Sequence, residues 1–278
     1  MNPDLARLLG YIVSEGWVNH DRMFTICQDG RLNPEVNHDI VSLSRSQMGY
    51  RLDPLDNDKQ VSSKFLRTYL EWMGVDYTLS ADKCIPPVIL RSTRASVVQF
   101  VRAFVDAECS VCENGLEVSS ASERMLRELQ VLLLRLGVVS SRRPKQVKGN
   151  DHTYWRLQIT GDNLRRYRTE VGMVSARKAA MLDILCDRDS NSNSNVIPQA
   201  IELVESLRAE IFLRAGGQGK GGGLNKRFGN TFVHTLTHVR HGRRNPTYAF
   251  LQRMLSVAKT VGADNTDAFR AVSDYVQL

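Results

Sequence analysis

Two stretches of the chain share one pattern: Leu8-Leu9-Gly10-Tyr11-Ile12-Val13-Ser14-Glu15-Gly16 and Val101-Arg102-Ala103-Phe104-Val105-Asp106-Ala107-Glu108-Cys109. Each is an apolar helical run with a small residue at its third and seventh positions, Gly10 and Ser14 in the first and Ala103 and Ala107 in the second. Residues four apart lie on one face of a helix, so each helix has a flat strip on one side. We expect the two helices to pack side by side in parallel, with their backbones almost in contact.

Both stretches place a carboxylate at the end of the helix, Glu15 and Glu108. Parallel packing would bring these two side chains together, and like charges in a shared site raise each other's pKa. A divalent metal ion is the usual remedy, and Mg²⁺ prefers oxygen ligands. We therefore predict a metal site formed by Glu15 and Glu108, with the backbone carbonyls of Ser14 and Ala107 as further ligands. Asp106 points to another face of its helix, which predicts a structural or peripheral role.

The two runs resemble the paired LAGLIDADG motifs of homing endonucleases, in the form where one chain carries both copies. In that family the motif helices form the interface of two pseudo-symmetric halves, and the last acidic residue of each motif binds the catalytic metal. The resemblance assigns this role to Glu15 and Glu108. The chain departs from the family pattern because glutamate replaces the usual aspartate in both copies, and because Cys109 stands where the motif closes with glycine.

The resemblance implies a monomer that cleaves both strands of a long duplex DNA target without a protein partner. Magnesium is the expected cofactor; Mn²⁺ is expected to substitute, and Ca²⁺ to bind without supporting turnover. Lys83 and Lys178 follow their carboxylates at nearly the same separation, 68 and 70 residues. They resemble the basic residues that line each active site of the family, and we predict that they are catalytic.

The composition favours a folded intracellular protein with a polyanionic partner. The net charge is +7, and residues 211–263 contain nine Lys or Arg and no Asp or Glu. No apolar run is long enough to span a bilayer, the N-terminus lacks the regions of a signal peptide, and no basic helix with an aromatic face predicts binding to a membrane surface. Five scattered cysteines indicate reduced thiols, and the Cys109–Cys112 pair has no second pair to complete a zinc site.

The order of predicted elements is written twice, which predicts an α+β fold of two αββαββα halves with saddle-shaped antiparallel sheets. We place the first half at residues 1–91 and the second at 92–187. Expected strands cover residues 17–19, 23–28, 50–55 and 59–62 in the first half, and 109–112, 116–119, 141–147 and 154–159 in the second. Asn114-Gly115 is a strong turn signal in the second half, and Gly137 is expected to cap a helix at residues 122–136.

Residues 188–197 are a polar, low-complexity stretch, which we interpret as a linker. A small all-helical domain is expected at 198–278, with helices at 198–213 and 247–261. The glycine-rich run 216–223 does not fit a phosphate-binding loop. The stretch from Thr231 to Val261 is similar to a repressor-type helix-turn-helix, with Thr231, His234, Thr235 and His238 on the presumed recognition helix.

Candidate DNA contacts follow from basic and amide side chains on the expected strands and in the C-terminal domain. They are Arg22, Gln28, Arg51, Lys59, Arg142, Arg143, Lys145, Lys148, Arg156, Arg240, Arg243 and Arg244. Two alternatives keep the fold without the cleavage chemistry: an intron RNA maturase, and a transcription regulator that joins a degenerate LAGLIDADG unit to a helix-turn-helix. The acidic residue in both motifs favours the endonuclease over these.

Overall fold

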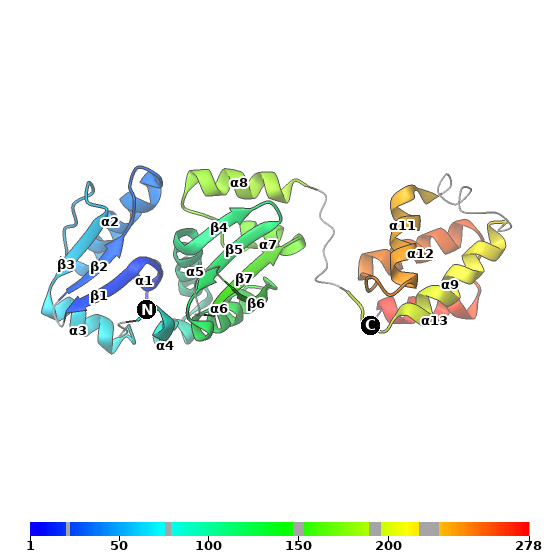
Figure 1. Ribbon diagram of the computed structural model, residues 1–278, viewed down its shortest axis with the longest axis horizontal. Coiled ribbons are helices and arrows are strands. Elements are labelled where there is room, and N and C mark those ends of the chain that lie inside the picture. Colours follow the sequence, from blue (N-terminus) through cyan, green and yellow to red (C-terminus); the bar gives the residue numbers. More distant parts are fainter. Residues whose placement is uncertain (21–22, 76–78, 147–152, 189–195, 217–227, 278) are drawn as a thin grey trace. The chain divides into compact units, whose positions relative to one another are not determined.

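The computed structural model describes residues 1–20, 23–75, 79–146, 153–188, 196–216 and 228–277. The chain divides into two compact units, Met1–Asn191 and Ser192–Leu278 (Figure 1). The boundary between them lies within the stretch that we interpreted as a linker, residues 188–197. The predicted halves 1–91 and 92–187 both belong to the first unit.

The first half begins with a capped helix. The side chain of Asn2 accepts a hydrogen bond from the backbone N–H of Leu5 at 2.7 Å, and Pro3 occupies the first turn. The elements in order are α1 (Pro3–Glu15), β1 (Gly16–His20), β2 (Met23–Cys27), α2 (Pro34–Met48), β3 (Asp58–Ser62), α3 (Lys64–Trp72), a 3₁₀ turn η1 (Ser80–Asp82) and α4 (Pro87–Leu90).

The second half has the predicted order of helix, hairpin, helix, hairpin, helix. Its elements are α5 (Arg94–Glu108), β4 (Cys109–Cys112), β5 (Gly115–Ser120), α6 (Glu123–Arg135), β6 (Ser141–Lys145), β7 (Tyr154–Thr160), α7 (Asp162–Glu170) and α8 (Ala176–Cys186). The antiparallel sheet has the strand order β4-β5-β7-β6. The hairpin predicted around Asn114-Gly115 forms, with Glu113 and Asn114 as its turn residues and Gly115 as the first residue of β5, opposite Cys112. Gly137 ends the α6 segment with a φ of +77°, which confirms the predicted cap.

The strand predicted at residues 50–55 does not form, so the described first-half sheet has three strands, in the order β1-β2-β3. Asp53 instead makes a local turn in which its side chain accepts a hydrogen bond from the N–H of Leu55 at 2.8 Å. The carbonyl of Pro54 accepts from the side chain of Asn37 on α2 at 2.9 Å, and Pro54 has no N–H to offer a strand. The α+β class and the antiparallel sheets are confirmed, but the two halves are less alike than predicted.

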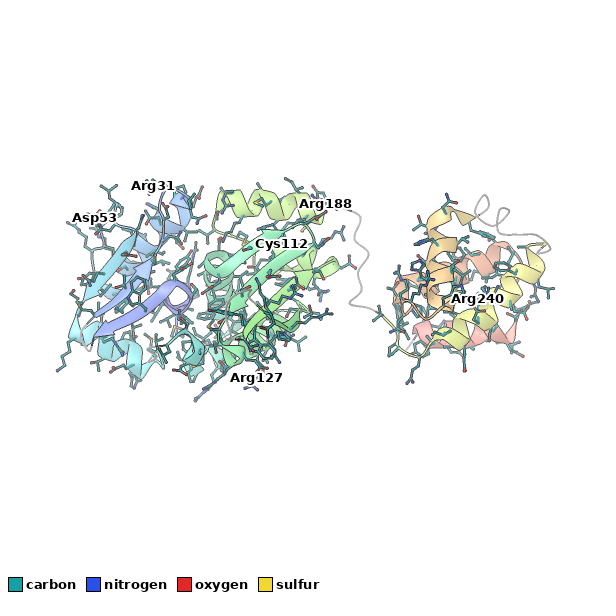
Figure 2. All side chains as sticks on the ribbon, viewed as in Figure 1. Arg31, Asp53, Cys112, Arg127, Arg188 and Arg240 are labelled. Carbon is teal, nitrogen blue, oxygen red and sulfur yellow. The ribbon has the colours of Figure 1, made fainter. Side chains whose placement is uncertain are left out.

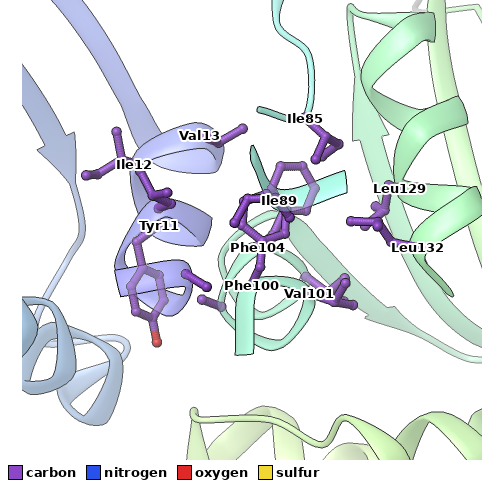
Figure 3. Packing of buried hydrophobic residues seen from close by; sticks show 14 of the residues in the cluster. Tyr11, Ile12, Val13, Ile85, Ile89, Phe100, Val101, Phe104, Leu129 and Leu132 are labelled. Carbon is purple, nitrogen blue, oxygen red and sulfur yellow. The ribbon is translucent and has the colours of Figure 1, made fainter. Parts of the chain in front are cut away.

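One hydrophobic core joins the two halves. Helices α1 and α5 lie side by side between the two sheets (Figure 1), and residues on both contribute to the same buried cluster. Figure 3 shows Tyr11, Ile12 and Val13 of α1 opposite Phe100 and Phe104 of α5. This core is continuous across α1 and α5. It therefore fixes the ends of both helices, which carry Glu15 and Glu108.

The second unit is a small helical domain with its own core. It contains α9 (Ile201–Arg214), α11 (Asn230–Arg240), α12 (Tyr248–Thr260) and α13 (Asp267–Gln277). Residues from all four helices build one buried cluster, which includes Val204, Phe232, Leu251 and Val272. The predicted helices at 198–213 and 247–261 correspond to α9 and α12. Most of the glycine-rich run 216–223 lies outside the described residues. In the described part of the chain, no helix has the length and apolar character that a membrane span requires.

Candidate active site and nucleic-acid interface

Helices α1 and α5 approach each other at Gly10. A Cβ atom at this position would lie 2.6 Å from the carbonyl oxygen of Phe100 and 2.8 Å from the Cβ of Ala103. Contacts that short do not occur, so only glycine permits this crossing. The small-residue strip predicted from the sequence is therefore the surface along which the two helices meet.

Glu15 and Glu108 end these helices and interact with each other. Burial, followed by the negative charge of Glu15, raises the pKa of Glu108 to about 7. Burial also raises the pKa of Glu15, while Lys83 and Lys178 act to lower it. Glu15, Ser14 and Lys83 line a cavity of 210 Å³ beside the end of α1. The structure thus brings together all four side chains that we predicted to be catalytic, two carboxylates and two amines.

Each lysine is tied to the motif helix of its own half. The Nζ atom of Lys83 donates to the carbonyl oxygens of Val13 at 3.1 Å and Ser14 at 2.8 Å. The Nζ atom of Lys178 donates to the carbonyl of Asp106, which occupies the same motif position as Val13. A cation at the end of a helix neutralises the partial negative charge of its free carbonyls. Two equivalent contacts from residues that are far apart in sequence support the internal repeat.

The backbone carbonyls of Ser14 and Ala107, which we predicted as further metal ligands, lie in different surroundings. The carbonyl oxygen of Ser14 accepts a hydrogen bond from Lys83, and Ser14 also lines the cavity beside Glu15, so its role as a metal ligand stays a prediction. Ala107 is half-buried at the equivalent position of α5, and its role stays a prediction. Cys109 takes a φ of −83°, so the chain leaves α5 in an extended conformation that needs no glycine.

Asp106 has the structural role predicted for it. It is 1% exposed, and its Oδ2 atom accepts hydrogen bonds from the backbone N–H groups of Val174 and Ser175. These N–H groups precede α8, where a negative charge is favourable. Asp106 therefore fixes the start of the helix that supplies Lys178.

The outer face of the second sheet is lined with polar side chains, because the apolar strand residues Leu116, Val118, Leu157 and Ile159 are buried on the other face. The strand register places Arg156 opposite both Ser119 and Arg143, and Lys145 opposite Tyr154. Three predicted DNA contacts, Arg143, Lys145 and Arg156, therefore share this open face. Arg142 does not: it pairs with Glu123 of α6 and lies over the ring of Trp155, so it belongs to the helix-covered face.

Two predicted contacts in the first half are also misplaced. Lys59 is 1% exposed and donates to the carbonyl of Asp56, and Gln28 is 7% exposed. The sequence held a signal for Lys59, because it lies two residues from the buried Val61 and alternate residues of a strand share a face. Arg51 is exposed, in the stretch that does not form a strand. Arg22 and Lys148 lie outside the described residues.

In the second unit, basic side chains gather at the end of α11. Arg240 is exposed (Figure 2), as is Arg243, and Arg244 is half-buried. The rings of His234 and His238 stack with centroids 4.2 Å apart, and the pKa of His238 is lowered by burial and by the surrounding cationic groups. The surface that we predicted to contact phosphates is therefore rich in positive charge, with Glu205 3.8 Å from Arg240 as a carboxylate at its side.

The sequence reasoning missed two polar residues on the outer face of the second sheet, Glu117 and Gln158. The alternation of apolar residues around them indicates that their side chains lie on the outer face. Among polar strand residues, however, our predicted DNA contacts included only basic side chains and Gln28. Among the described residues, no group of three or more His, Cys, Asp or Glu side chains could hold a metal ion. A metal at the helix ends would thus have two carboxylates as its charged ligands, as the sequence predicted.

Solved structures with a similar arrangement include I-DmoI in complex with DNA and Mn, with a TM-score of 0.46 and 16% identity over 61% of this chain and 96% of that one. Full-length DUF199/WhiA from Thermatoga maritima has a TM-score of 0.43 and 10% identity, over 99% of this chain and 90% of that one.

Curated relatives are larger proteins of several kinds. The replication factor C small subunit of Methanocaldococcus jannaschii is 25% identical over 217 residues, 76% of this chain but 12% of the relative. The probable translation initiation factor IF-2 of Thermococcus kodakarensis is 29% identical over 55% of this chain and 13% of its own length. The replicative DNA helicase DnaB of Rhodothermus marinus is 25% identical over 52% of this chain and 17% of its own length. The chain thus spans less than a fifth of each of these relatives.

A family model described as a LAGLIDADG-like domain matches residues 95–172. These residues contain most of α5 with Glu108, and the whole of the second sheet with its polar outer face. Residues 95–172 of this chain therefore match a LAGLIDADG-like domain.

Proposed function

We propose that this protein is a site-specific homing endonuclease that cleaves both strands of a long DNA duplex by metal-dependent phosphodiester hydrolysis. The observation that carries the proposal is the four-residue cluster at the end of the α1–α5 pair. Glu15 and Glu108 come together from two equivalent helices, and Lys83 and Lys178 come from equivalent places in the two halves. A pseudo-symmetric site suits two equivalent reactions, one on each strand of a duplex.

The donor chemistry of the cluster fits a divalent cation. Burial raises the pKa of both half-buried carboxyl groups, and the charge of Glu15 raises that of Glu108 further, which is costly unless a positive charge lies between them. Carboxylate oxygens are the ligands that Mg²⁺ and Mn²⁺ prefer, and Glu15 and Glu108 would hold the ion. When bound, such an ion supplies an activated water and neutralises charge on the phosphate. Ca²⁺ is expected to bind without supporting turnover.

The chain's own residues prepare this site. Lys83 and Lys178 neutralise the carbonyl ends of the motif helices and keep a positive charge near both carboxylates. Glu108 must lose its proton before it can bind a cation. The core beneath the helix pair fixes the spacing of the two carboxylates, and Gly10 sets how closely the helices approach.

The relatives support a mobile element. One segment resembles small parts of a replication factor, a translation factor and a helicase, proteins with different activities. A shared segment that accounts for less than a fifth of each is explained most simply by insertion into unrelated host genes. A site-specific cut in an empty copy of the gene is the step that would spread such an insertion. Because one chain carries both motifs, we propose that it acts as an intracellular monomer without a protein partner.

The test is digestion of a DNA library that contains candidate insertion sites, in Mg²⁺, Mn²⁺, Ca²⁺ or EDTA. The wild-type protein should cut both strands at defined sites in Mg²⁺ and Mn²⁺, and should only bind in Ca²⁺. Glu15→Gln and Glu108→Gln should bind the same sites and cut at a rate at least about a hundredfold lower. Glu35→Gln, an exposed carboxylate of α2, is the matched control and should cut normally.

The outcomes separate the candidate functions. Sequence-specific duplex binding without a cut in any metal, unchanged by both substitutions, would reject the endonuclease and favour a transcription regulator. Preference for a folded intron RNA over every duplex would favour a maturase.

A further inference from the structure

A hydrogen-bonded cluster lies on the open face of the second sheet, away from the helix ends. Glu117 of β5 is at its centre. Its Oε1 atom accepts from Nζ of Lys145 at 2.8 Å, and its Oε2 atom accepts from Nε2 of Gln158 at 3.0 Å. Lys145 also donates to the hydroxyl of Ser119 at 3.1 Å, and a guanidinium nitrogen of Arg156 lies 3.8 Å from Oε2. Three strands contribute to this cluster, so it is not a local feature of one turn.

The cluster faces solvent and is not part of the core. The side chains of Lys145 and Arg156 are each 37% exposed, while Glu117 beneath them is 14% exposed. The apolar residues that alternate with them are buried on the opposite face of the sheet. A carboxylate that lies under two partly exposed cations controls where those cations point.

The charge of Glu117 determines how its neighbours are oriented. The hydrogen bond from Lys145 is the main cause that lowers the pKa of this carboxyl, so it is ionised at neutral pH. An ionised carboxylate only accepts hydrogen bonds, so Gln158 must turn its NH₂ group towards it. The carbonyl oxygen of Gln158 is then directed away from Glu117. The ammonium of Lys145 has three N–H groups, of which Glu117 and Ser119 accept two.

We propose that Glu117 is a positioning residue for sequence reading, which holds Gln158, Lys145 and Arg156 in fixed orientations towards base edges in the major groove. The inference rests on the proposed function and adds where and how the site is read. A fixed amide and a fixed ammonium distinguish bases, because adenine and cytosine offer donors where guanine offers acceptors. Glu117 also lowers the sequence-independent affinity for DNA, because its negative charge repels the phosphates of any duplex that binds this face. Both effects favour the correct sequence over other DNA.

The first test is Glu117→Gln in the full-length protein, with selection from a randomised duplex library in Ca²⁺. The amide can both donate and accept, so Gln158 is no longer forced into one orientation. Discrimination at the base positions that this cluster reads should fall about tenfold, while affinity for unrelated DNA rises. Glu123→Gln is the matched control: it removes the same charge from an ion pair with β6, but on the helix-covered face. It should leave the base preference unchanged.

A second variant separates positioning from a general loss of structure. Gln158→Met keeps the size of the side chain and removes the amide, and it should relax the same base positions as Glu117→Gln. Circular dichroism and thermal unfolding check that both variants fold. If Glu117→Gln does not fold, the base preference of Gln158→Met alone tests the inference. Unchanged preference in a folded variant overturns the inference and leaves the proposed function intact. If the wild-type protein selects no sequence at all, the proposed function fails and this inference fails with it.

Discussion

Gly10 decides how closely the two motif helices approach, and a substitution there has two opposing effects. In the middle of a helix, Gly→Ala normally stabilises by about 1 kcal/mol, because alanine has the better helix propensity. At Gly10 the new Cβ would lie 2.6 Å from a backbone oxygen, which cannot rotate out of the way as a side chain can. We expect Gly10→Ala to destabilise the protein by about 1 to 3 kcal/mol.

Urea unfolding of the full chain in EDTA measures this effect. Ser42→Ala, on the exposed side of α2, is the control and should stay within about 0.5 kcal/mol of the wild type. A Gly10→Ala protein more stable than the wild type would mean that α1 and α5 do not meet at this residue.

Glu108 makes stability depend on pH. Its pKa rises from 4.5 to about 7 on folding, so between these values the folded state binds more protons than the unfolded state. Stability therefore falls as the pH rises through this window, by up to about 3 kcal/mol from this residue. Glu108→Gln should remove that part of the slope. Urea unfolding at pH 4.5, 6 and 7.5 in EDTA tests the difference between the two proteins, with Glu35→Gln expected to follow the wild type. Parallel profiles for wild type and Glu108→Gln would show that burial does not retain the proton.

At the scale of elements, the carboxylate of Asp106 attaches the start of α8 to α5. The carboxylate of Asp106 accepts hydrogen bonds from two backbone N–H groups that precede this helix. The backbone carbonyl of Asp106 accepts a hydrogen bond from Lys178. Asp106→Ala would leave two donors unsatisfied in a buried place, at about 1 to 3 kcal/mol each. We expect a loss of stability of at least about 2 kcal/mol, together with slower cleavage because the start of α8, which carries Lys178, is no longer fixed by the carboxylate.

Hydrogen exchange of the amides at the start of α8 measures this attachment directly. Asp162→Ala, at the more exposed first turn of α7, is the control. Exchange that is equally slow in wild type and Asp106→Ala would show that other contacts fix α8.

The elements also show what a sequence can and cannot predict. The motif helices and the Asn114-Gly115 turn depend on residue spacing within one segment, so they were predicted. The strand predicted at 50–55 would have needed a neighbouring strand to bond its backbone. Instead, the side chain of Asn37 on α2 donates a hydrogen bond to the carbonyl of Pro54, and the sequence does not reveal this long-range contact. Strand β6, Ser-Arg-Arg-Pro-Lys, has no aliphatic or aromatic residue to mark its buried face, so Arg142 and Arg143 could not be told apart.

At the scale of the whole molecule, the repeat is closer in the helices than in the sheets. The two motif helices and their two lysines are equivalent. The sheets differ, because the second has a fourth strand and carries Arg143, Lys145 and Arg156 on its open face. On the corresponding face of the first sheet the exposed residues of β3 are Gln60, opposite the buried Thr25, and Asp58, opposite Cys27. A common catalytic centre with unlike reading surfaces fits an asymmetric target.

The second unit gives the last prediction, which concerns how much of the chain contacts DNA. Each phosphate contact changes the slope of log affinity against log salt by about 0.9. If the unit binds the duplex through the end of α11, Arg243→Gln with Arg244→Gln should reduce the magnitude of that slope by about 2. The position of the cut should not change, because the first unit contains the catalytic cluster.

The control for this charge change is Arg31→Gln with Arg127→Gln, two exposed residues of the first unit (Figure 2) that lie outside its open sheet faces. Filter binding or fluorescence anisotropy in Ca²⁺, from 50 to about 300 mM salt, gives both slopes. A slope that the α11 pair leaves unchanged would mean that the second unit does not touch the duplex. The long duplex target would then have to be read by the two sheets alone.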